Sequence, residues 1–374
     1  MKIAMLSCNT GEGHNSTAKA VQNVLEQRGV TCERIDVLAC LSPKFSRFLC
    51  NWHVRLYRYG PKIFDASYRA FERSESDPNE STPLYELLTL GVKKLAEQLD
   101  AGGFDAILCV HVFSGLMMTE LRRTGRITLP CFFAATDYTC SPFVERCEMD
   151  GYFIPAADLA GEFIRAGLPA EKLIPSGIPV RQAFYSAITR QEARIGLGLP
   201  EQGQVLLMMC GSMGCGPMKV LAESLVNRLD DDTMVVAICG NNEKLLTALR
   251  EIESSKLRPI GFTERVSDYM DAADMMVTKP GGLSSTEAAN KHLPVVFINV
   301  VGGCESRNFN YFLSHGYGIG SSDEDEVLEQ TLLLARYPKQ LQRMRRNLQE
   351  DFRINSAVQI ADCLMQAARK KAES

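Results

Sequence analysis

The sequence predicts an α/β protein made of two similar halves. Short apolar runs alternate with amphipathic stretches along most of the chain, which is the pattern of strands followed by helices. A glycine turn follows the first apolar run of each half. A chain of 374 residues also exceeds the size of one ordinary core. We therefore assign an amino-terminal domain to residues 1–180, a carboxyl-terminal domain to 181–355 and a last helix to 356–374, which we expect to pack back on the first domain.

The bulk composition excludes several classes of protein. A hydrophobic content of 45% and a charged content of 23% are typical of a soluble globular protein, and a net charge of −4 gives no reason to expect a nucleic-acid partner. The 13 cysteines are scattered and form neither a CxxC pair nor a cluster with zinc spacing, so we expect reduced core residues of a cytosolic protein. The chain starts on its first strand without a signal peptide, and no run of about 18 apolar residues indicates a membrane span.

The first half opens with a strand, a glycine turn and a helix. The expected strand is Lys2–Ser7, the turn runs from Cys8 to His14, and the helix covers Ser16–Arg28. The turn lacks the third glycine of the dinucleotide-binding fingerprint, and its distinctive member is His14. A later strand, 127–134, ends in Ala-Thr-Asp137. Because ligands of open α/β sheets bind at the carboxyl ends of the strands, we expect His14 and Asp137 at one such edge.

Residues 41–73 interrupt the α/β pattern. They hold eight of the 29 aromatic residues, including the single tryptophan, and seven basic residues against two acidic ones. Aromatic and basic side chains together suit a surface that docks on anionic lipid headgroups. The alternative is an ordinary helical insertion whose aromatics pack on the domain and whose bases are solvated.

The second half contains the arrangement of a strand followed by a glycine turn and a helix twice. The strand 205–210 leads into the glycine turn 211–217, and the strand 275–277 leads into Lys279-Pro-Gly-Gly282. We expect Ser284 and Ser285 to act as N-caps of the following helix, with Glu287 in its first turn. Free N–H groups and the positive end of such a helix suit an anion such as a diphosphate, and Glu287 can accept hydrogen bonds from sugar hydroxyls. The alternative is an ordinary strand-to-helix connection. A hinge is expected at 176–190.

These motifs together resemble the family of monogalactosyldiacylglycerol synthases and processive diacylglycerol glucosyltransferases, over nearly the whole chain. The motifs are Gly11-Glu-Gly-His14, Thr136-Asp-Tyr138, Ser176-Gly-Ile-Pro-Val180, Gly211-Ser-Met-Gly214, Gly261-Phe262, Val277-Thr-Lys-Pro-Gly-Gly282, Glu287-Ala288 and Glu305-x-x-Asn308. The resemblance implies two facing Rossmann-like domains of the glycosyltransferase B type with a cleft between them. It implies an inverting enzyme that moves a hexose, from UDP-glucose or UDP-galactose, to diacylglycerol at the cytoplasmic face of the membrane.

The resemblance also implies a role for each matching residue. For the donor, Phe262 would lie by the uracil, Glu287 would hold the ribose hydroxyls, and Glu305 and Asn308 would contact the hexose. The diphosphate would be surrounded by Gly211, Ser212, Met213, Gly214, Lys279, Gly281, Gly282, Leu283 and Ser284. The acceptor and the membrane would meet Gly11, Gly13, Phe48, Trp52, Arg55 and Arg58.

For the chemistry, His14 is the expected base, and Asp137 is either its rival or the group that orients it. The glycine turns and the helix end can meet the charge of the leaving diphosphate, so we expect neither a cofactor nor a metal. Two Asp-x-Asp triplets, 230–232 and 323–325, lie in polar stretches and are interpreted as solvated surface.

The sequence departs from the family pattern near the acceptor and the hexose. Ser141 stands at a histidine position, Val144 at a tryptophan position and Cys304 at a glutamine position. Three other functions therefore stay open: an N-acetylglucosaminyltransferase acting on a lipid-linked cell-wall precursor, a UDP-sugar epimerase, and a UDP-sugar sensor without turnover.

Overall fold

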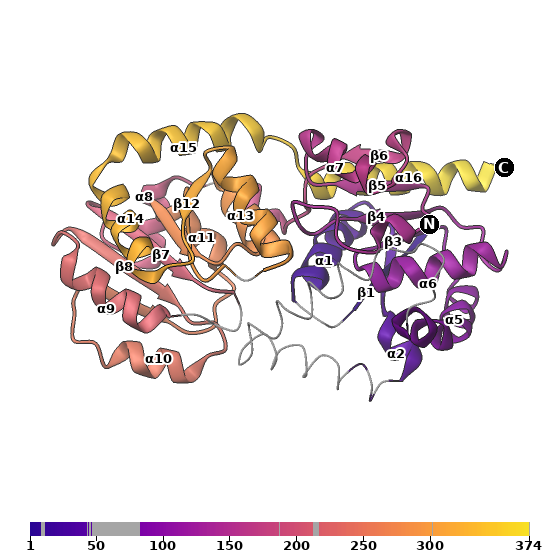
Figure 1. Ribbon diagram of the computed structural model, residues 1–374, viewed down its shortest axis with the longest axis horizontal. Helices are drawn as coiled ribbons and strands as arrows, with labels where there is room; N and C mark the ends of the chain where they lie inside the picture. The colour runs from indigo at the N-terminus through magenta and orange to yellow at the C-terminus, as the bar shows by residue number, and fades with distance from the viewer. Residues whose placement is uncertain are drawn as a thin grey trace. The chain divides into compact units, whose positions relative to one another are not determined.

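The computed structural model describes residues 1–8, 12–42, 44, 46, 83–186, 188–211, 217–300 and 302–373 (Figure 1). The chain forms two compact units. Unit 1 comprises Met1–Arg181 and Ile354–Ser374, and unit 2 comprises Gln182–Arg353. The final helix, α16 (Ser356–Glu373), therefore belongs to unit 1, where it packs against α1 (Glu12–Gln27). No helix in the described part of the chain is both long and apolar enough to cross a membrane.

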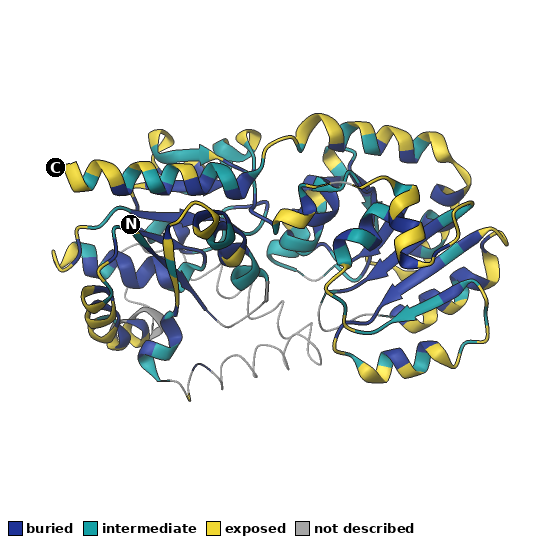
Figure 2. Cartoon of the chain, turned by 180° about the vertical axis from the view of Figure 1, so that it is seen from behind, coloured by how far each residue is buried: buried dark blue, intermediate teal, exposed yellow. Residues whose placement is uncertain are grey.

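Unit 1 contains a parallel sheet in the order β2-β1-β3-β4-β5-β6. Its strands are β1 (Lys2–Ser7), β2 (Thr31–Asp36), β3 (Ala106–Cys109), β4 (Cys131–Ala134), β5 (Gly151–Ile154) and β6 (Leu173–Pro175). Its other helices are α2 (Val37–Leu41), α5 (Pro83–Gly102), α6 (Val112–Arg123) and α7 (Ala160–Arg165), with short 3-10 turns at Val144–Arg146, Ala157–Leu159 and Ala170–Lys172. Every residue of β3, β4 and β5 is buried, as expected for parallel strands covered by helices on both faces (Figure 2).

Unit 2 contains a second parallel sheet, in the order β12-β11-β10-β7-β8-β9. Its strands are β7 (Gln204–Met209), β8 (Thr233–Ile238), β9 (Leu257–Ile260), β10 (Met275–Thr278), β11 (Val295–Phe297) and β12 (Gly318–Gly320). Its helices are α8 (Arg190–Leu197), α9 (Met218–Arg228), α10 (Glu243–Arg250), α11 (Val266–Ala272), α12 (Gly282–Asn290), α13 (Cys304–Ser314), α14 (Glu324–Arg336) and α15 (Pro338–Asp351), after a 3-10 turn at Gln182–Phe184. If the six strands are numbered in chain order, they lie in the order 6-5-4-1-2-3 across the sheet, which is the strand order typical of Rossmann folds.

The α/β prediction is confirmed, and the structure corrects three local expectations. The first helix begins at Glu12 rather than Ser16, so His14 lies on the helix and not in a turn before it. Helix α12 begins at Gly282 with Gly281 as its N-cap, so Ser284 and Ser285 are not caps and Glu287 lies beyond the first turn. Strand β12 and helices α8 and α10 were not predicted.

The expected hinge, 176–190, spans the boundary between the two units. Ser176 and Gly177 donate their backbone N–H groups to the Ile154 carbonyl at 3.1 and 3.2 Å, which attaches the start of this segment to unit 1. Lys291, at the end of α12, donates to the Ser186 carbonyl and forms an ion pair with Asp271, which attaches the following residues to unit 2. The stretch between the two anchored residues, Gly177 and Ser186, is therefore short.

Three aspartates hold the amino edges of the sheets in the same way. Each one directly precedes a strand and exchanges two hydrogen bonds with a residue at the start of the neighbouring strand. The aspartate N–H donates to that residue's carbonyl at 2.7 to 2.8 Å, and the carboxylate accepts that residue's N–H at 2.7 to 2.9 Å. The pairs are Asp105 with Lys2, Asp150 with Cys131 and Asp274 with Val205. The carboxylate thus satisfies an N–H that the sheet ladder leaves open.

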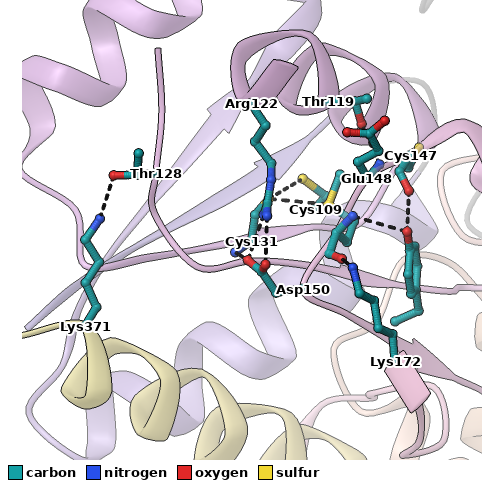
Figure 3. A network of polar contacts seen from close by, with 12 residues as sticks. Cys109, Thr119, Arg122, Thr128, Cys131, Cys147, Glu148, Asp150, Lys172 and Lys371 are labelled. Carbon is teal, nitrogen blue, oxygen red and sulfur yellow. Dashed lines mark hydrogen bonds and ion pairs between the residues drawn. The ribbon is translucent and has the colours of Figure 1, made fainter. Parts of the chain in front are cut away.

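Each of these carboxylates also has a cationic partner. Figure 3 shows Arg122 donating to both oxygens of Asp150 at 2.7 Å, with the Cys131 N–H on the same carboxylate. Burial alone would raise the pKa of Asp150, but the hydrogen bonds from Arg122 and from Cys131 lower it below its usual value. The same figure shows Lys371 of α16 donating to the Thr128 hydroxyl, a contact that holds the last helix on unit 1.

Of the three aspartates, Asp274 forms ion pairs with two arginines, whereas in the described structure the other two each pair with one cation. Arg190 and Arg194 contact the two Asp274 oxygens at 2.7 and 2.8 Å, and the Arg194 side chain is only 4% exposed. Arg194 further donates to the carbonyls of Ala272, Glu201 and Gly203. A buried guanidinium with so many fixed partners depends on Asp274 for its countercharge.

We expect Asp274→Asn to lower the free energy of unfolding by about 3–5 kcal/mol, because Arg194 would stay buried without its countercharge. Asp231→Ala removes a fully exposed carboxylate that contacts Lys256 at 3.4 Å, and this control should leave stability at the wild-type level. Urea unfolding of the three proteins measures the difference. Equal stability of Asp274→Asn and wild type would show that Asp274 does not hold this edge.

Candidate functional site

Each sheet has one place where the strand order reverses direction. In unit 1 this switch point lies between β1 and β3, and in unit 2 it lies between β7 and β10. The loops that leave the two strands of a switch point diverge, and ligands of open α/β sheets bind in the gap. The expected site residues follow these strands: His14 comes after β1, Gly211 after β7, and Lys279–Gly282 after β10.

His14 is held at the switch point of unit 1 by groups from two other strands. Its Nδ1 lies 2.7 Å from the carbonyl oxygen of Val110, which follows β3. The hydroxyl of Thr136, which follows β4, lies 3.3 Å from the same nitrogen. His14 is half-buried in the first turn of α1, and its ring is directed at other elements instead of capping its own helix.

This geometry determines which nitrogen of His14 carries the proton. A carbonyl oxygen only accepts hydrogen bonds, so Nδ1 must be the protonated nitrogen that donates to Val110. In the neutral imidazole the lone pair is then on Nε2. His14 therefore presents a free basic nitrogen on the side of the ring away from Val110.

The surroundings also favour the neutral form of His14. Burial lowers its pKa below the ordinary value of 6.5, and the carboxylate of Asp137 and the Val110 carbonyl oppose this shift without reversing it. An imidazole with a lowered pKa is unprotonated at neutral pH and available as a base. Asp137 thus acts on His14 through its charge. Its carboxylate lies 3.5 Å from the Thr136 hydroxyl, the same hydroxyl that contacts the His14 ring.

His111 was not among the predicted site residues, yet it contacts His14 directly. The two rings are 4.7 Å apart between centroids and meet edge to face at 70°. His111 follows β3 and caps α6. Its position after a strand next to the switch point was the available signal, but the contact joins residues 97 positions apart in the sequence (111 − 14).

The loop after Asp137 holds two of the three positions at which the sequence departs from the family pattern, Ser141 and Val144. The carboxylate of Glu162 on α7 accepts hydrogen bonds from the Thr139 hydroxyl and the Cys140 N–H, which fixes the loop. Ser141 is half-buried, whereas Val144 is 1% exposed and part of the core of unit 1. The Val144 side chain therefore fills space inside the domain and is closed to a ligand.

The start of α12 follows β10, one of the two strands at the switch point of unit 2. Gly281 has no side chain to cap the helix, and the first backbone bond of the helix runs from the Ser285 N–H to the Gly281 carbonyl at 3.0 Å. Among the described residues, the N–H groups of Gly282, Leu283 and Ser284 have no acceptor, and the buried hydroxyl of Ser285 has no hydrogen-bond partner. Unsatisfied N–H groups at the positive end of a helix form a binding site for an anion.

The turn before α12 is fixed by residues that lie later in the chain. Asn308, fully buried on α13, donates from Nδ2 to the Pro280 carbonyl at 3.0 Å. Lys279 pairs with Glu305 at 3.1 Å, and both side chains are mostly buried. A Cβ at Gly211 would lie 3.5 Å from Lys279 Cε, so Gly211 lies beside the turn after β10. The structure thus brings together Gly211, Lys279, Gly281, Glu305 and Asn308.

The remaining predicted donor residues are placed individually. Phe262 follows β9 and is 66% exposed, which is unusual for a large aromatic side chain. Glu287 is 7% exposed, in the second turn of α12. Gly13 lies in the first turn of α1, and Cys304, which is half-buried and in no disulfide, begins α13. Gly11, Phe48, Trp52, Arg55, Arg58, Ser212, Met213 and Gly214 lie outside the described residues, so their predicted roles stay predictions.

The two Asp-x-Asp triplets lie at the surface, as expected. Residues 230–232 and 323–325 are exposed, and Asp323 caps α14 by accepting the Glu326 N–H at 2.9 Å. The cysteines in the described part of the chain form no disulfide with one another, and most of them are buried.

Comparisons with known proteins match both halves of the chain. Residues 14–180 match the family model of monogalactosyldiacylglycerol synthase, and residues 205–361 match that of the glycosyltransferase family 28 C-terminal domain. A processive diacylglycerol β-glucosyltransferase of Bacillus subtilis is 28% identical over 383 aligned positions, covering 100% of this chain and 98% of the relative. The Bacillus licheniformis protein of the same name is 27% identical, covering 95% and 92%.

Solved structures share the fold at low sequence identity. MurG of Acinetobacter baumannii superposes with a TM-score of 0.65 at 14% identity, covering 98% of this chain and 99% of that one. The UDP-GlcNAc 2-epimerase of Neisseria meningitidis gives 0.59 at 14% identity, covering 99% and 100%. The two Rossmann-like sheets are therefore those of the glycosyltransferase B-type fold.

The fold does not distinguish transferases from epimerases, but the matches along the sequence do. Both family models describe glycosyltransferases, and the relatives aligned over the whole chain are glycosyltransferases too. The protein belongs to the family of monogalactosyldiacylglycerol synthases and processive diacylglycerol glucosyltransferases, and it is a glycosyltransferase.

Proposed function

We propose that this enzyme transfers glucose from UDP-glucose to the hydroxyl of diacylglycerol with inversion at the anomeric carbon, forming a glycolipid. The names of the relatives support glucose and diacylglycerol, and UDP-galactose is the alternative donor. One observation carries the proposal: the two switch points hold complementary chemistry. Unit 2 presents an anion site, and unit 1 presents an unprotonated imidazole.

The start of α12 supports a diphosphate donor. Its three N–H groups without acceptors and the helix dipole suit the phosphate oxygens and the charge that grows on UDP as it leaves. Lys279 is paired with Glu305, so it adds a full charge only if a ligand separates that pair. Structures of Staphylococcus aureus MnaA and Anabaena Alr3699/HepE, which share the fold with TM-scores of 0.60 and 0.54, were solved with UDP.

His14 supports transfer to a hydroxyl. In the proposed step Nε2 removes the hydroxyl proton of diacylglycerol, and the oxygen attacks the anomeric carbon of glucose. The bond from that carbon to the diphosphate breaks, and its electron pair leaves with UDP. One displacement inverts the configuration at the carbon. We assign Asp137 the role of supporting the charge that His14 gains, because its carboxylate acts on that imidazole.

This mechanism uses no metal or cofactor, because the N–H groups of α12 meet the charge of the leaving group. Phe262 is exposed and is suited to lie against the uracil, and Glu287 is suited to accept hydrogen bonds from the ribose hydroxyls.

The lipid acceptor requires contact with a membrane. We assign this contact to the cytoplasmic face of the membrane and to residues 41–73 of the protein, including Phe48, Trp52, Arg55 and Arg58. Charge reversal at Arg55 and Arg58 should weaken binding to anionic vesicles, and unchanged binding would refute that assignment.

The proposal is tested by identifying the product. The purified protein is incubated with UDP-glucose, UDP-galactose or UDP-N-acetylglucosamine and diacylglycerol vesicles, and lipids are analysed by mass and by anomeric configuration. We expect hexosyl-diacylglycerol of β configuration, formed fastest from UDP-glucose. Binding of UDP-glucose without any glycolipid would instead indicate a sensor, and conversion of the free UDP-sugar would indicate an epimerase. Transfer only to a lipid-linked peptidoglycan precursor would replace the acceptor.

Replacing His14 should strongly slow transfer but spare donor binding. We expect His14→Gln to lower kcat about 10²–10⁴-fold, the usual effect of losing a general base, with UDP affinity near the wild-type value. Because only the unprotonated imidazole accepts the proton, wild-type activity should fall as pH drops through the lowered pKa of His14, below 6.5. Calorimetric UDP titration and a pH profile of kcat measure both effects. A fully active His14→Gln enzyme would exclude His14 as the base.

Gly281→Asp separates the stability of α12 from its ligand binding. A Cβ at Gly281 meets nothing within 4 Å, and its backbone is extended, so Asp fits as an N-cap. We expect the carboxylate to accept the free N–H groups and hold or raise the melting temperature, while UDP affinity falls because the anion site is occupied. Gly281→Ala, the control, adds bulk without an acceptor and should keep more of the affinity. If Gly281→Asp binds UDP as tightly as wild type, the diphosphate lies elsewhere.

A further inference from the structure

His111 is fixed at the start of α6 by three hydrogen bonds. Its ring Nδ1 accepts the Phe113 N–H at 3.1 Å, which makes His111 the N-cap of the helix. Its carbonyl accepts the Ser114 hydroxyl at 2.5 Å and the Gly115 N–H at 3.2 Å. Ring and backbone of this residue are therefore held together in one geometry.

The capping bond defines the charge state of His111. A nitrogen that accepts a backbone N–H carries no proton, so the His111 ring is neutral with its proton on Nε2. This is the opposite tautomer from His14, whose Nδ1 donates to Val110. The two rings thus differ in the nitrogen that each leaves unprotonated.

The same cap also positions the partner of His14. Val110 and His111 share a peptide bond, and the conformation of His111 (φ −143°, ψ 142°) is fixed by the cap. The Val110 carbonyl that selects the tautomer of His14 is therefore oriented by the residue that follows it.

His111 is also part of a row of three rings. Its centroid lies 4.7 Å from that of His14 and 4.6 Å from that of Phe113, and both contacts are edge to face. The His111 ring thus takes space beside His14 that water would otherwise fill, and burial is the main cause of the lowered pKa of His14.

In the described part of the chain, Asp137 and His111 are the titratable groups that act on His14 from other elements. Asp137, after β4, favours the protonated form of His14 through its charge. His111, after β3, opposes that form, because its ring lies against His14 and excludes water from that side. His111 therefore counterbalances Asp137 at the same ring.

We propose that His111 is a positioning residue for His14, which orients the Val110 carbonyl, excludes water and keeps Nε2 of His14 unprotonated at neutral pH. The inference rests on the proposed function only in taking His14 as the base. It adds a residue whose imidazole, and not only its capping bond, sets the pH range of the reaction.

Two variants of His111 separate the ring from the cap. His111→Asn keeps a side-chain oxygen that can accept the Phe113 N–H but removes the imidazole. His111→Ala removes both. We expect the pKa of His14, measured by NMR titration of its ring carbon, to rise toward 6.5 in His111→Asn and at least as far in His111→Ala. The acidic limb of the kcat profile should move to higher pH in parallel, with KM for the UDP-sugar near the wild-type value.

A purely structural role for His111 gives a different result. If only the cap mattered, His111→Asn would keep the wild-type pKa of His14 and the wild-type profile, and the inference would fail. The NMR titration needs no substrate, so it decides the inference even if no glycolipid is formed.

A measurement on the unmodified protein guards against variants that do not fold. Nitrogen chemical shifts should show the Nδ1–H tautomer for His14 and the Nε2–H tautomer for His111. The same tautomer in both rings would contradict the proposed arrangement.

Discussion

The parallel direction of every strand is the constraint from which the rest of the structure follows. All neighbouring strands in both sheets run the same way, so each strand ends at the same edge as its neighbours. Residues far apart in the sequence are thereby brought to one line of loops, and the reversal of strand order opens a gap in that line. The predicted site residues follow the strands at these gaps: the imidazole of His14 in unit 1 and the start of α12 in unit 2.

The opposite edges of the sheets serve stability. Asp105, Asp150 and Asp274 each bind the start of a neighbouring strand through the same two hydrogen bonds, and each has a cation beside it. The N–H groups of Lys2, Cys131 and Val205 at the amino edges are thus satisfied within the protein, whereas those at the start of α12 have no acceptor among the described residues. This contrast is a physical sign of which edge binds a ligand, since a protein gains nothing for its own stability by leaving donors open.

Much of the fold could be predicted because buried parallel strands are short apolar runs, and β1, β7 and β10 lie within a residue or so of their expected bounds. Strand β12 was missed because Gly318–Gly320 forms no apolar run and is defined only by pairing with β11. The start of α12 was misplaced for a similar reason. Serines favour N-cap positions locally, but Asn308 fixes the Pro280 carbonyl from α13, and the helix begins directly after Gly281.

The residues of the candidate site were likewise predictable only where a motif in the sequence marks them. His14 and Lys279 were predicted from the glycine turns that they adjoin, and Asn308 from the resemblance to the family. The contact between Lys279 and Glu305 and the contact between His111 and His14 depend on tertiary structure, so no local motif indicates them.

Amide hydrogen exchange can show whether the amides at the start of α12 bind the diphosphate of a UDP-sugar. The N–H groups of Gly282, Leu283 and Ser284 have no acceptor in the described structure, so they should exchange rapidly in the free protein. UDP should slow their exchange strongly and leave the amino-edge amide of Val205, already bonded to Asp274, unchanged. Saturation with UDP and no protection at 282–284 would contradict the account.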